Sequence, residues 1–371
     1  MDTKRVAIIS SAQTELRPAW SSAQHIDLIS AVVGEVFKGV GLSLDDVDFI
    51  IDSGSDVLDG RSISNCGFLG AMGAHHKEES RVEEDGLWAA QYGALKIAAG
   101  AAGLGLIIAY SKPSESNVDA FYASQVEPFF QRPVGFDHKA ASGIQAQRYL
   151  AATGANVESL ADIVALRSSA ARRYGGAPDV ATVTSVDVLN SPSAARPLTE
   201  KMLSQPADGA VALLIASEDI AKRVSRKPVW ITGMGASADR HAFAARKANA
   251  LEACEVAGAA ALKRAGWAAK DADLAEVSGS TVVGELLVLE ALGVTAPLKG
   301  IGAAGGSVAV NPSGGALPAD PIMATGLVRL AHAARALSEP SDYGLKAASK
   351  ALAHGAGGVG MQTHCVFALE V

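Results

Sequence analysis

The stretch that decides the fold is Asp46-Val47-Asp48-Phe49-Ile50-Ile51-Asp52-Ser53-Gly54-Ser55, which recurs as Asp271-Ala272-Asp273-Leu274-Ala275-Glu276-Val277-Ser278-Gly279-Ser280. The matched Asp, Gly and Ser residues keep one constant offset. A helix-like segment precedes each copy, at 25–40 and 248–265, and a β-rich run precedes each helix, at 5–10 and 228–233. Each half therefore opens strand–helix–strand, which predicts an α/β protein with a parallel sheet covered by helices.

Each half also ends in an apolar run typical of a buried strand, at 209–216 and at 362–371. We therefore expect two similar halves, residues 1–225 and 226–371. Residues about 112–205 are richer in Pro, Arg and polar side chains and contain helix-like stretches at 144–153 and 159–174. This insertion is predicted to form a loop domain that covers a pocket.

Composition excludes several classes of protein. Of the 371 residues, 49% are hydrophobic and 19% charged, which is too apolar for a disordered chain and too charged for a membrane bundle. The formal net charge is −7 and no Lys/Arg run exceeds a dipeptide, so nucleic-acid binding has no electrostatic basis. No apolar run approaches the roughly 20 residues needed to span a bilayer.

The three cysteines, Cys66, Cys254 and Cys365, form no CxxC motif and are too few for a disulfide framework. We expect all three to be buried, with no metal site. Residues 1–5 lead directly into the strand-like run 6–9 without a secretory signal pattern. A cytoplasmic location is the simplest expectation.

Three Gly-containing segments carry a family resemblance: Asn311-Pro312-Ser313-Gly314-Gly315 followed by Pro321–Gly326, Pro206-Ala207-Asp208-Gly209-Ala210, and His354-Gly355-Ala356-Gly357-Gly358-Val359-Gly360. In this order and spacing they resemble the thiolase superfamily, in particular the sterol-carrier-protein-type and archaeal-type thiolases. The resemblance implies a five-layered α-β-α-β-α thiolase fold, CoA-thioester substrates and a dimer. It also implies Claisen or retro-Claisen chemistry.

The resemblance places Gly86 where thiolases carry their nucleophilic cysteine. The segment 81–90 reads RVEEDGLWAA. A glycine cannot form an acyl-enzyme, and the adjacent Glu84 and Asp85 would disfavour a thiolate. We expect Asp85 to cap the helix that begins near Gly86, and Gly86 to contact substrate only through its backbone.

Two further catalytic positions of the family are also changed. Ser278, Gly279, Ser280 and Thr281 replace the acid/base motif, so Ser278 and Ser280 could only hydrogen-bond a substrate, or simply form a turn. Asp320 replaces the histidine that helps to bind the oxyanion, where it would have to be a buried, neutral acid to help.

Of the residues in these motifs, only His354 keeps a functional type, so the resemblance makes it the catalytic candidate, with Gly357 of the same turn contacting substrate. The first hypothesis for function is a CoA-thioester-binding pseudoenzyme. It would be a non-thiolytic subunit of a heteromeric acyl-CoA-processing complex in lipid metabolism, beside a small OB-fold, zinc-ribbon protein.

The alternative is a retro-aldol lyase that acts on a β-hydroxyacyl-CoA, as do the thiolase-like aldolases of steroid side-chain breakdown. Those aldolases also lack the cysteine and use tyrosine, which points to Tyr343. An acyltransferase or ketosynthase is a weaker third possibility, because it needs the missing nucleophile. Arg240, Arg246 and Lys247 form a modest basic group that would suit the CoA phosphates.

Overall fold

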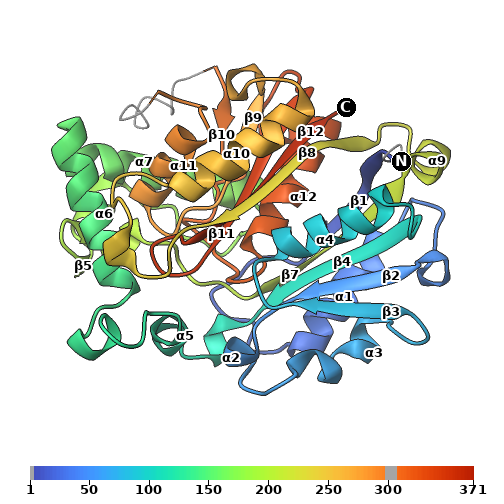
Figure 1. Cartoon of the computed structure of the whole chain (residues 1–371), viewed down its shortest axis with the longest axis horizontal. Helices are drawn as coiled ribbons and strands as arrows, with labels where there is room; N and C mark the ends of the chain where they lie inside the picture. Colours follow the sequence, from blue (N-terminus) through green and yellow to red (C-terminus); the bar gives the residue numbers. More distant parts are fainter. Residues whose placement is uncertain (1–3, 297–306) are drawn as a thin grey trace.

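A computed structural model describes residues 4–296 and 307–371, so the first three residues of the N-terminal segment considered above lie outside it. Ten strands of the described chain form one sheet in the order β10-β9-β11-β12-β8-β1-β7-β4-β2-β3 (Figure 1). The first half supplies β1 (Val6–Gln13), β2 (Phe49–Ser53), β3 (Glu78–Val82), β4 (Leu104–Ser111) and β7 (Gly209–Ser217). The second half supplies β8 (Val229–Ala238), β9 (Leu274–Val277), β10 (Ala309–Val310), β11 (Lys350–Gly357) and β12 (Thr363–Glu370).

The strand order confirms the internal repeat. From the centre outward the first half runs β1-β7-β4-β2-β3 and the second runs β8-β12-β11-β9-β10. In both halves the first two neighbour pairs are antiparallel and the outer two are parallel. The prediction of a parallel sheet was therefore wrong in part, because the strands that close each half, β7 and β12, run against their neighbours. The halves join where β1 pairs antiparallel with β8.

Asp48 and Asp273 occupy the same place in the two copies of the repeat, and they make equivalent hydrogen bonds. Asp48 Oδ2 accepts hydrogen bonds from Gly103 N at 2.7 Å and Leu104 N at 3.0 Å, where β4 begins. Asp273 Oδ2 accepts them from Ser349 N at 2.7 Å and Lys350 N at 3.0 Å, where β11 begins. Each aspartate thus satisfies backbone donors that enter the equivalent strand of its half.

Helices form the other layers (Figure 1). Between the two halves lie α4 (Gly86–Ala98) and α12 (Thr325–Ser338), which contact each other and the strands of both halves. On the outer faces, α1 (His25–Val36) packs on β1, β4 and β7, and α10 (Glu252–Ala265) packs on β8 and β12. The arrangement is the expected layered α/β thiolase fold. The buried faces of α4 and α12 contribute alanine and leucine side chains to the largest core cluster.

Residues 112–205 contain most of the remaining helices: α5 (Val118–Ser124), α6 (His138–Thr153), α7 (Val157–Tyr174) and α8 (Ser185–Leu189), with the short strands β5 (Ser193–Ala195) and β6 (Leu198–Thr199). In Figure 1, α6 and α7 (green) stand beside the second half, where they contact α11 (Val282–Ala291). Three short helices complete the chain: α2 (Asp56–Asp59), α3 (Leu69–Met72) and α9 (Glu218–Val224). Among the described residues, no helix combines the length and apolarity needed to cross a bilayer.

Candidate active site

A pocket of about 450 Å³ opens where the two halves and the inserted segment meet. Both copies of the repeat reach it, through Ser55 from the first half and Ser280 from the second. The inserted segment contributes Phe121 and Tyr122 from α5. The turn between β11 and β12 forms another wall. The pocket therefore lies at the pseudo-symmetric junction, where loops that follow equivalent strands converge.

The elbow before α4 has no space for a side chain at Gly86. A Cβ there would lie 2.7 Å from the Cβ atoms of both Ala109 and Leu327, which is closer than carbon atoms pack. The backbone is fixed as well, because Gly86 N donates to Met323 O at 2.6 Å. Gly86 is buried and does not line the pocket, whereas the preceding residue, Asp85, does.

Asp85 ties the N-termini of the two central helices together. Its Oδ1 accepts from Leu87 N of α4 at 2.9 Å, which confirms the predicted cap, and its Oδ2 accepts from Gly326 N of α12 at 2.8 Å. The carboxylate thus occupies the positive ends of two helix dipoles. Burial raises the pKa of this carboxyl to about 7, although both backbone hydrogen bonds act to lower it.

Glu83, Glu84 and Asp320 also line this pocket. Glu84 approaches the β11–β12 turn so closely that a Cβ at Gly357 would lie 2.0 Å from its Oε1. The hydrogen bonds described for its carboxylate are long, from Thr363 Oγ1 at 3.3 Å and from the Asp85 backbone N at 3.4 Å. Burial raises the pKa of Glu84. It therefore has a side chain available for proton transfer.

Asp320 is another pocket carboxyl, 8% exposed, and Thr325 Oγ1 donates to it. Burial raises the pKa of Asp320, although the hydrogen bonds from Thr325 and Ser204 act to lower it. This agrees with the requirement, stated from the sequence, that an acid at this position be buried. Tyr122 also lines the pocket, and burial together with the nearby Asp320 raises the pKa of its phenol, which stays a protonated donor.

Of the residues proposed from the sequence, Ser278, Ser280, Asp320 and Gly357 do line this pocket. The hydroxyl proton of Ser278 is already used within the protein, because its Oγ donates to His354 O at 2.9 Å. The sequence reasoning did not select Glu84 or Tyr122. Glu84 had been considered only for its effect on a neighbouring thiol, and Tyr122 sits in the insertion, whose placement over the pocket requires the tertiary structure.

The two proposed catalytic residues do not line the pocket. The His354 side chain is fully buried, and its Nε2 lies 3.0 Å from His364 Nδ1. Burial holds the pKa of His354 well below its usual value. Tyr343 follows α12, where its hydroxyl lies 2.7 Å from His332 Nδ1, and burial raises its pKa to about 12. Neither group reaches a substrate in the pocket as it stands.

The proposed CoA-phosphate residues also lie outside this pocket. Arg246 donates to Val359 O at 2.8 Å and to Gly360 O at 3.3 Å, so it braces the β11–β12 turn from behind. Lys247 pairs with Glu252 at 2.6 Å on the surface, and Arg240 is exposed. Arg246 and Lys247 line a separate, more open cavity of about 770 Å³ together with Arg148 and aromatic side chains of the insertion.

The side chains of the Asn311–Gly315 motif bond to buried residues of the protein, so the motif has a structural role. Asn311 Nδ2 donates to Glu285 Oε2 at 2.8 Å, and Ser313 Oγ donates to Glu276 Oε2 at 2.7 Å. The buried Arg329 of α12 pairs with that same Glu276 oxygen at 2.8 Å. The loop is therefore held by buried charged groups, and it brings Ala316 and Asp320 to the pocket wall.

Comparison with known proteins agrees with this geometry. Residues 235–370 match the family described as thiolase C-terminal domain-like. Over 335 residues the chain is 28% identical to an acetyl-CoA acetyltransferase of Methanocaldococcus jannaschii, across 84% of this chain and 83% of that protein. It is also 28% identical over 197 residues to the benzoylsuccinyl-CoA thiolase subunit BbsB of Thauera aromatica, across 51% of each.

Solved structures show the same fold over the whole chain. The Ltp2-ChsH2(DUF35) aldolase superposes with a TM-score of 0.83 at 22% identity, across 100% of this chain and 99% of that chain. Human mitochondrial 3-ketoacyl-CoA thiolase superposes with a TM-score of 0.75 at 16% identity, with the same coverage. With the duplicated half-sheets, the paired central helices and the pocket at their junction, these matches show that the chain has the thiolase fold and that residues 235–370 are similar to the thiolase C-terminal domain.

Proposed function

We propose that this chain binds a CoA thioester in the pocket and cleaves a carbon–carbon bond of its acyl group by a retro-aldol reaction, without an acyl-enzyme. The proposal depends on one observation: neighbouring side chains fill the space around Gly86 at the elbow before α4. Gly86 has no room for a sulfur, and the carboxylate of Asp85 occupies the helix N-termini that would stabilise a thiolate. Chemistry that needs a covalent acyl intermediate is thereby disfavoured.

A retro-aldol step needs a base and an acid, and the pocket has candidates for both. In a β-hydroxyacyl-CoA, the base removes the hydroxyl proton, the Cα–Cβ bond breaks and its electron pair forms the thioester enolate. The β-carbon leaves as a ketone or aldehyde, and a proton then adds to the α-carbon. Glu84 is our candidate base, because its raised pKa and long hydrogen bonds leave its carboxylate reactive.

Donors for the enolate oxygen are the second requirement. Asp320 and Tyr122 both line the pocket, and both have raised pKa values that favour their protonated, hydrogen-bond-donating forms. Separate protonation states for neighbouring carboxyls are a common way to obtain an acid and a base in one site. A neutral Asp320 would stabilise the developing charge that an ionised one would repel.

The second candidate function is a non-catalytic subunit that only holds the thioester. Two observations favour it: His354 and Tyr343 stay outside the pocket, and two of the similar proteins carry names that describe an assembly, a thiolase subunit and an aldolase with a DUF35 partner. As a non-catalytic subunit, the chain would work as a dimer or beside an OB-fold, zinc-ribbon protein. Arg246 and Lys247 would then contact the CoA phosphates.

The deciding experiment incubates the purified chain, alone and with a co-expressed partner, with β-hydroxyacyl-CoA and measures release of the carbonyl product. We expect Glu84→Gln to lower kcat by about 10²-fold or more, the range for loss of a general base. Tyr343→Phe serves as the comparison and should keep its rate. Loss of activity in Tyr343→Phe but not in Glu84→Gln would refute the assignment. Tight CoA binding without turnover under every condition would support the non-catalytic subunit.

A further inference from the structure

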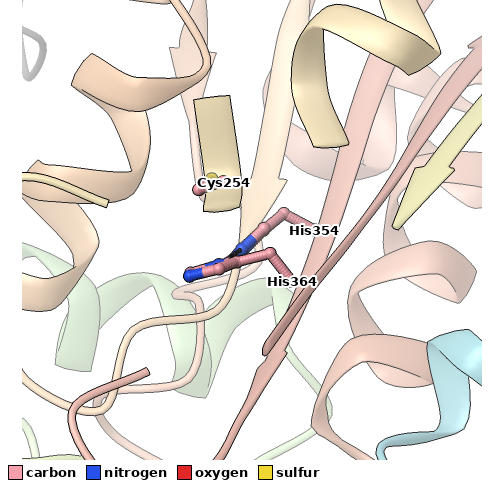
Figure 2. Close-up of side chains that lie close together, drawn as sticks. All are labelled: Cys254, His354 and His364. Atoms are coloured by element: carbon pink, nitrogen blue, oxygen red, sulfur yellow. Dashed lines mark hydrogen bonds between the residues drawn. The ribbon is translucent and has the colours of Figure 1, made fainter. Parts of the chain in front are cut away.

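A cysteine and two histidines converge behind the β11–β12 turn, outside the pocket. Figure 2 shows the rings of His354 (β11) and His364 (β12) side by side, with Cys254 reaching toward them from α10. One ligand atom from each residue can be chosen so that all three lie within 4.8 Å of one another. The side chains are 0–1% exposed. The sequence reasoning expected no metal site, because it found no CxxC motif or other spacing typical of metal ligands.

The hydrogen bonds around the two rings leave one nitrogen unsatisfied. His364 Nε2 lies 3.0 Å from Met361 O, so it carries the proton and leaves a lone pair on Nδ1. His354 Nε2 lies 3.0 Å from that Nδ1. If His354 Nε2 carries its proton, the lone pair of His354 Nδ1 is buried without a partner in the described structure. If it does not, two lone pairs face each other.

A metal ion resolves this conflict. The two imidazole nitrogens lie 3.0 Å apart, and ligands at about 2.0–2.1 Å around a three-coordinate ion are roughly 3.5 Å apart, so the rings would have to separate by about 0.5 Å to admit the metal. The bond from His364 Nε2 to Met361 O is the kind of outer contact that fixes the tautomer of a metal-bound histidine. A metal ion binds the neutral form of an imidazole, and both rings are buried with their nitrogens close to Cys254.

Charge balance indicates which metal. Cys254 would bind as a thiolate; burial and the nearby Glu255 raise the pKa of its thiol, so the positive charge of the metal has to replace the proton. One thiolate and two neutral imidazoles carry a charge of −1, so a monovalent ion makes the buried site neutral, whereas Zn²⁺ would leave it positive near Arg246. Thiolate and imidazole are also ligands that suit Cu⁺.

We propose that Cys254, His354 and His364 form a buried three-coordinate site for Cu⁺. Binding releases the thiol proton of Cys254, forms one Cu–S and two Cu–N bonds, and involves no change of oxidation state. Its structural consequence concerns the β11–β12 turn, because the ion would bridge both of its strands to α10. Gly357, Gly358 and Met361 of this hairpin line the acyl-CoA pocket, so the metal would hold one pocket wall in place.

The expectation that all three cysteines are buried was wrong for Cys66, which is exposed. The test therefore uses a Cys66→Ser background, because this thiol would bind copper non-specifically. The full-length protein is titrated anaerobically with Cu⁺ against a chromogenic chelator, after incubation long enough for a buried site to fill. The variants are Cys254→Ser, His364→Gln and, as the matched control, Cys365→Ser. Cys365 is equally buried but lies on the opposite face of β12, in a different core cluster. Circular dichroism verifies that each variant is folded.

We expect one Cu⁺ per chain in the background protein and in the Cys365→Ser control, with X-ray absorption showing one sulfur and two nitrogen ligands. Cys254→Ser and His364→Gln should weaken binding at least 100-fold. Equal binding by folded Cys254→Ser, or no binding by the folded background protein, would overturn the proposal. Binding of Zn²⁺ but not Cu⁺ by the same three residues would overturn the charge-balance argument.

Discussion

Replacing Asp85 by asparagine should change how the stability of the protein depends on pH. The folded-state pKa of this carboxyl is about 7, against 3.8 for the free group. The folded chain therefore keeps this proton after the unfolded chain has released it, so stability is highest below about pH 4 and falls as pH rises toward 7. Between about pH 5 and pH 8 the carboxyl should reduce the free energy of unfolding by about 2.5 kcal/mol.

The measurement is urea unfolding of wild type and Asp85→Asn across this pH range. The variant should start about 1–2 kcal/mol less stable, because an asparagine cannot accept from both Leu87 N and Gly326 N. It should then gain about 2.5 kcal/mol relative to wild type as pH rises. Asp46 is the control: hydrogen bonds from Ser43 lower its pKa below that of the free carboxyl, so it stays ionised in both states across this range and Asp46→Asn should differ from wild type by a pH-independent amount. A pH-independent difference for Asp85→Asn would refute the reasoning.

Three further predictions concern packing and hydrogen bonds. Gly86→Ala should lower the free energy of unfolding by about 1–3 kcal/mol through overpacking, and Gly86→Cys should give no acyl adduct by intact mass spectrometry after incubation with acyl-CoA. Arg329→Met should cost about 3–5 kcal/mol because it leaves Glu276 charged and buried; the double variant with Glu276→Leu should recover part of the loss in urea unfolding. Asp48→Asn and Asp273→Asn should each cost about 1 kcal/mol in the same assay, and markedly unequal losses would contradict their equivalence.

Much of the fold could be predicted from local patterns. The repeat of residues 46–55 at 271–280 placed equivalent strands in the two halves, and the structure explains it by the equivalent bonds of Asp48 and Asp273. Strand direction could not be predicted in the same way. Whether β7 and β12 run parallel or antiparallel to their neighbours depends on how the chain returns to the sheet after long intervening segments, which no short window contains.

The candidate site was predictable only in part. Ser280, Asp320 and Gly357 belong to short motifs next to strand ends, and they do reach the pocket. His354 belongs to such a motif too, but its ring is fully buried against His364 and does not line the pocket. Its partner there, Cys254, comes from α10, so that contact follows only from the packing of a helix on the sheet.

The bridge that Asp85 makes between Leu87 and Gly326 has a consequence for the elbow before α4. The first half donates one carboxylate that closes the helix ends of both halves, and glycines at 326 and 355 leave it the space. With this arrangement, a single substitution cannot place a reactive sulfur at the elbow, since a side chain at position 86 also requires Ala109 and Leu327 to move away. The atoms around the elbow therefore determine which residue position 86 can carry, as much as the residue itself does.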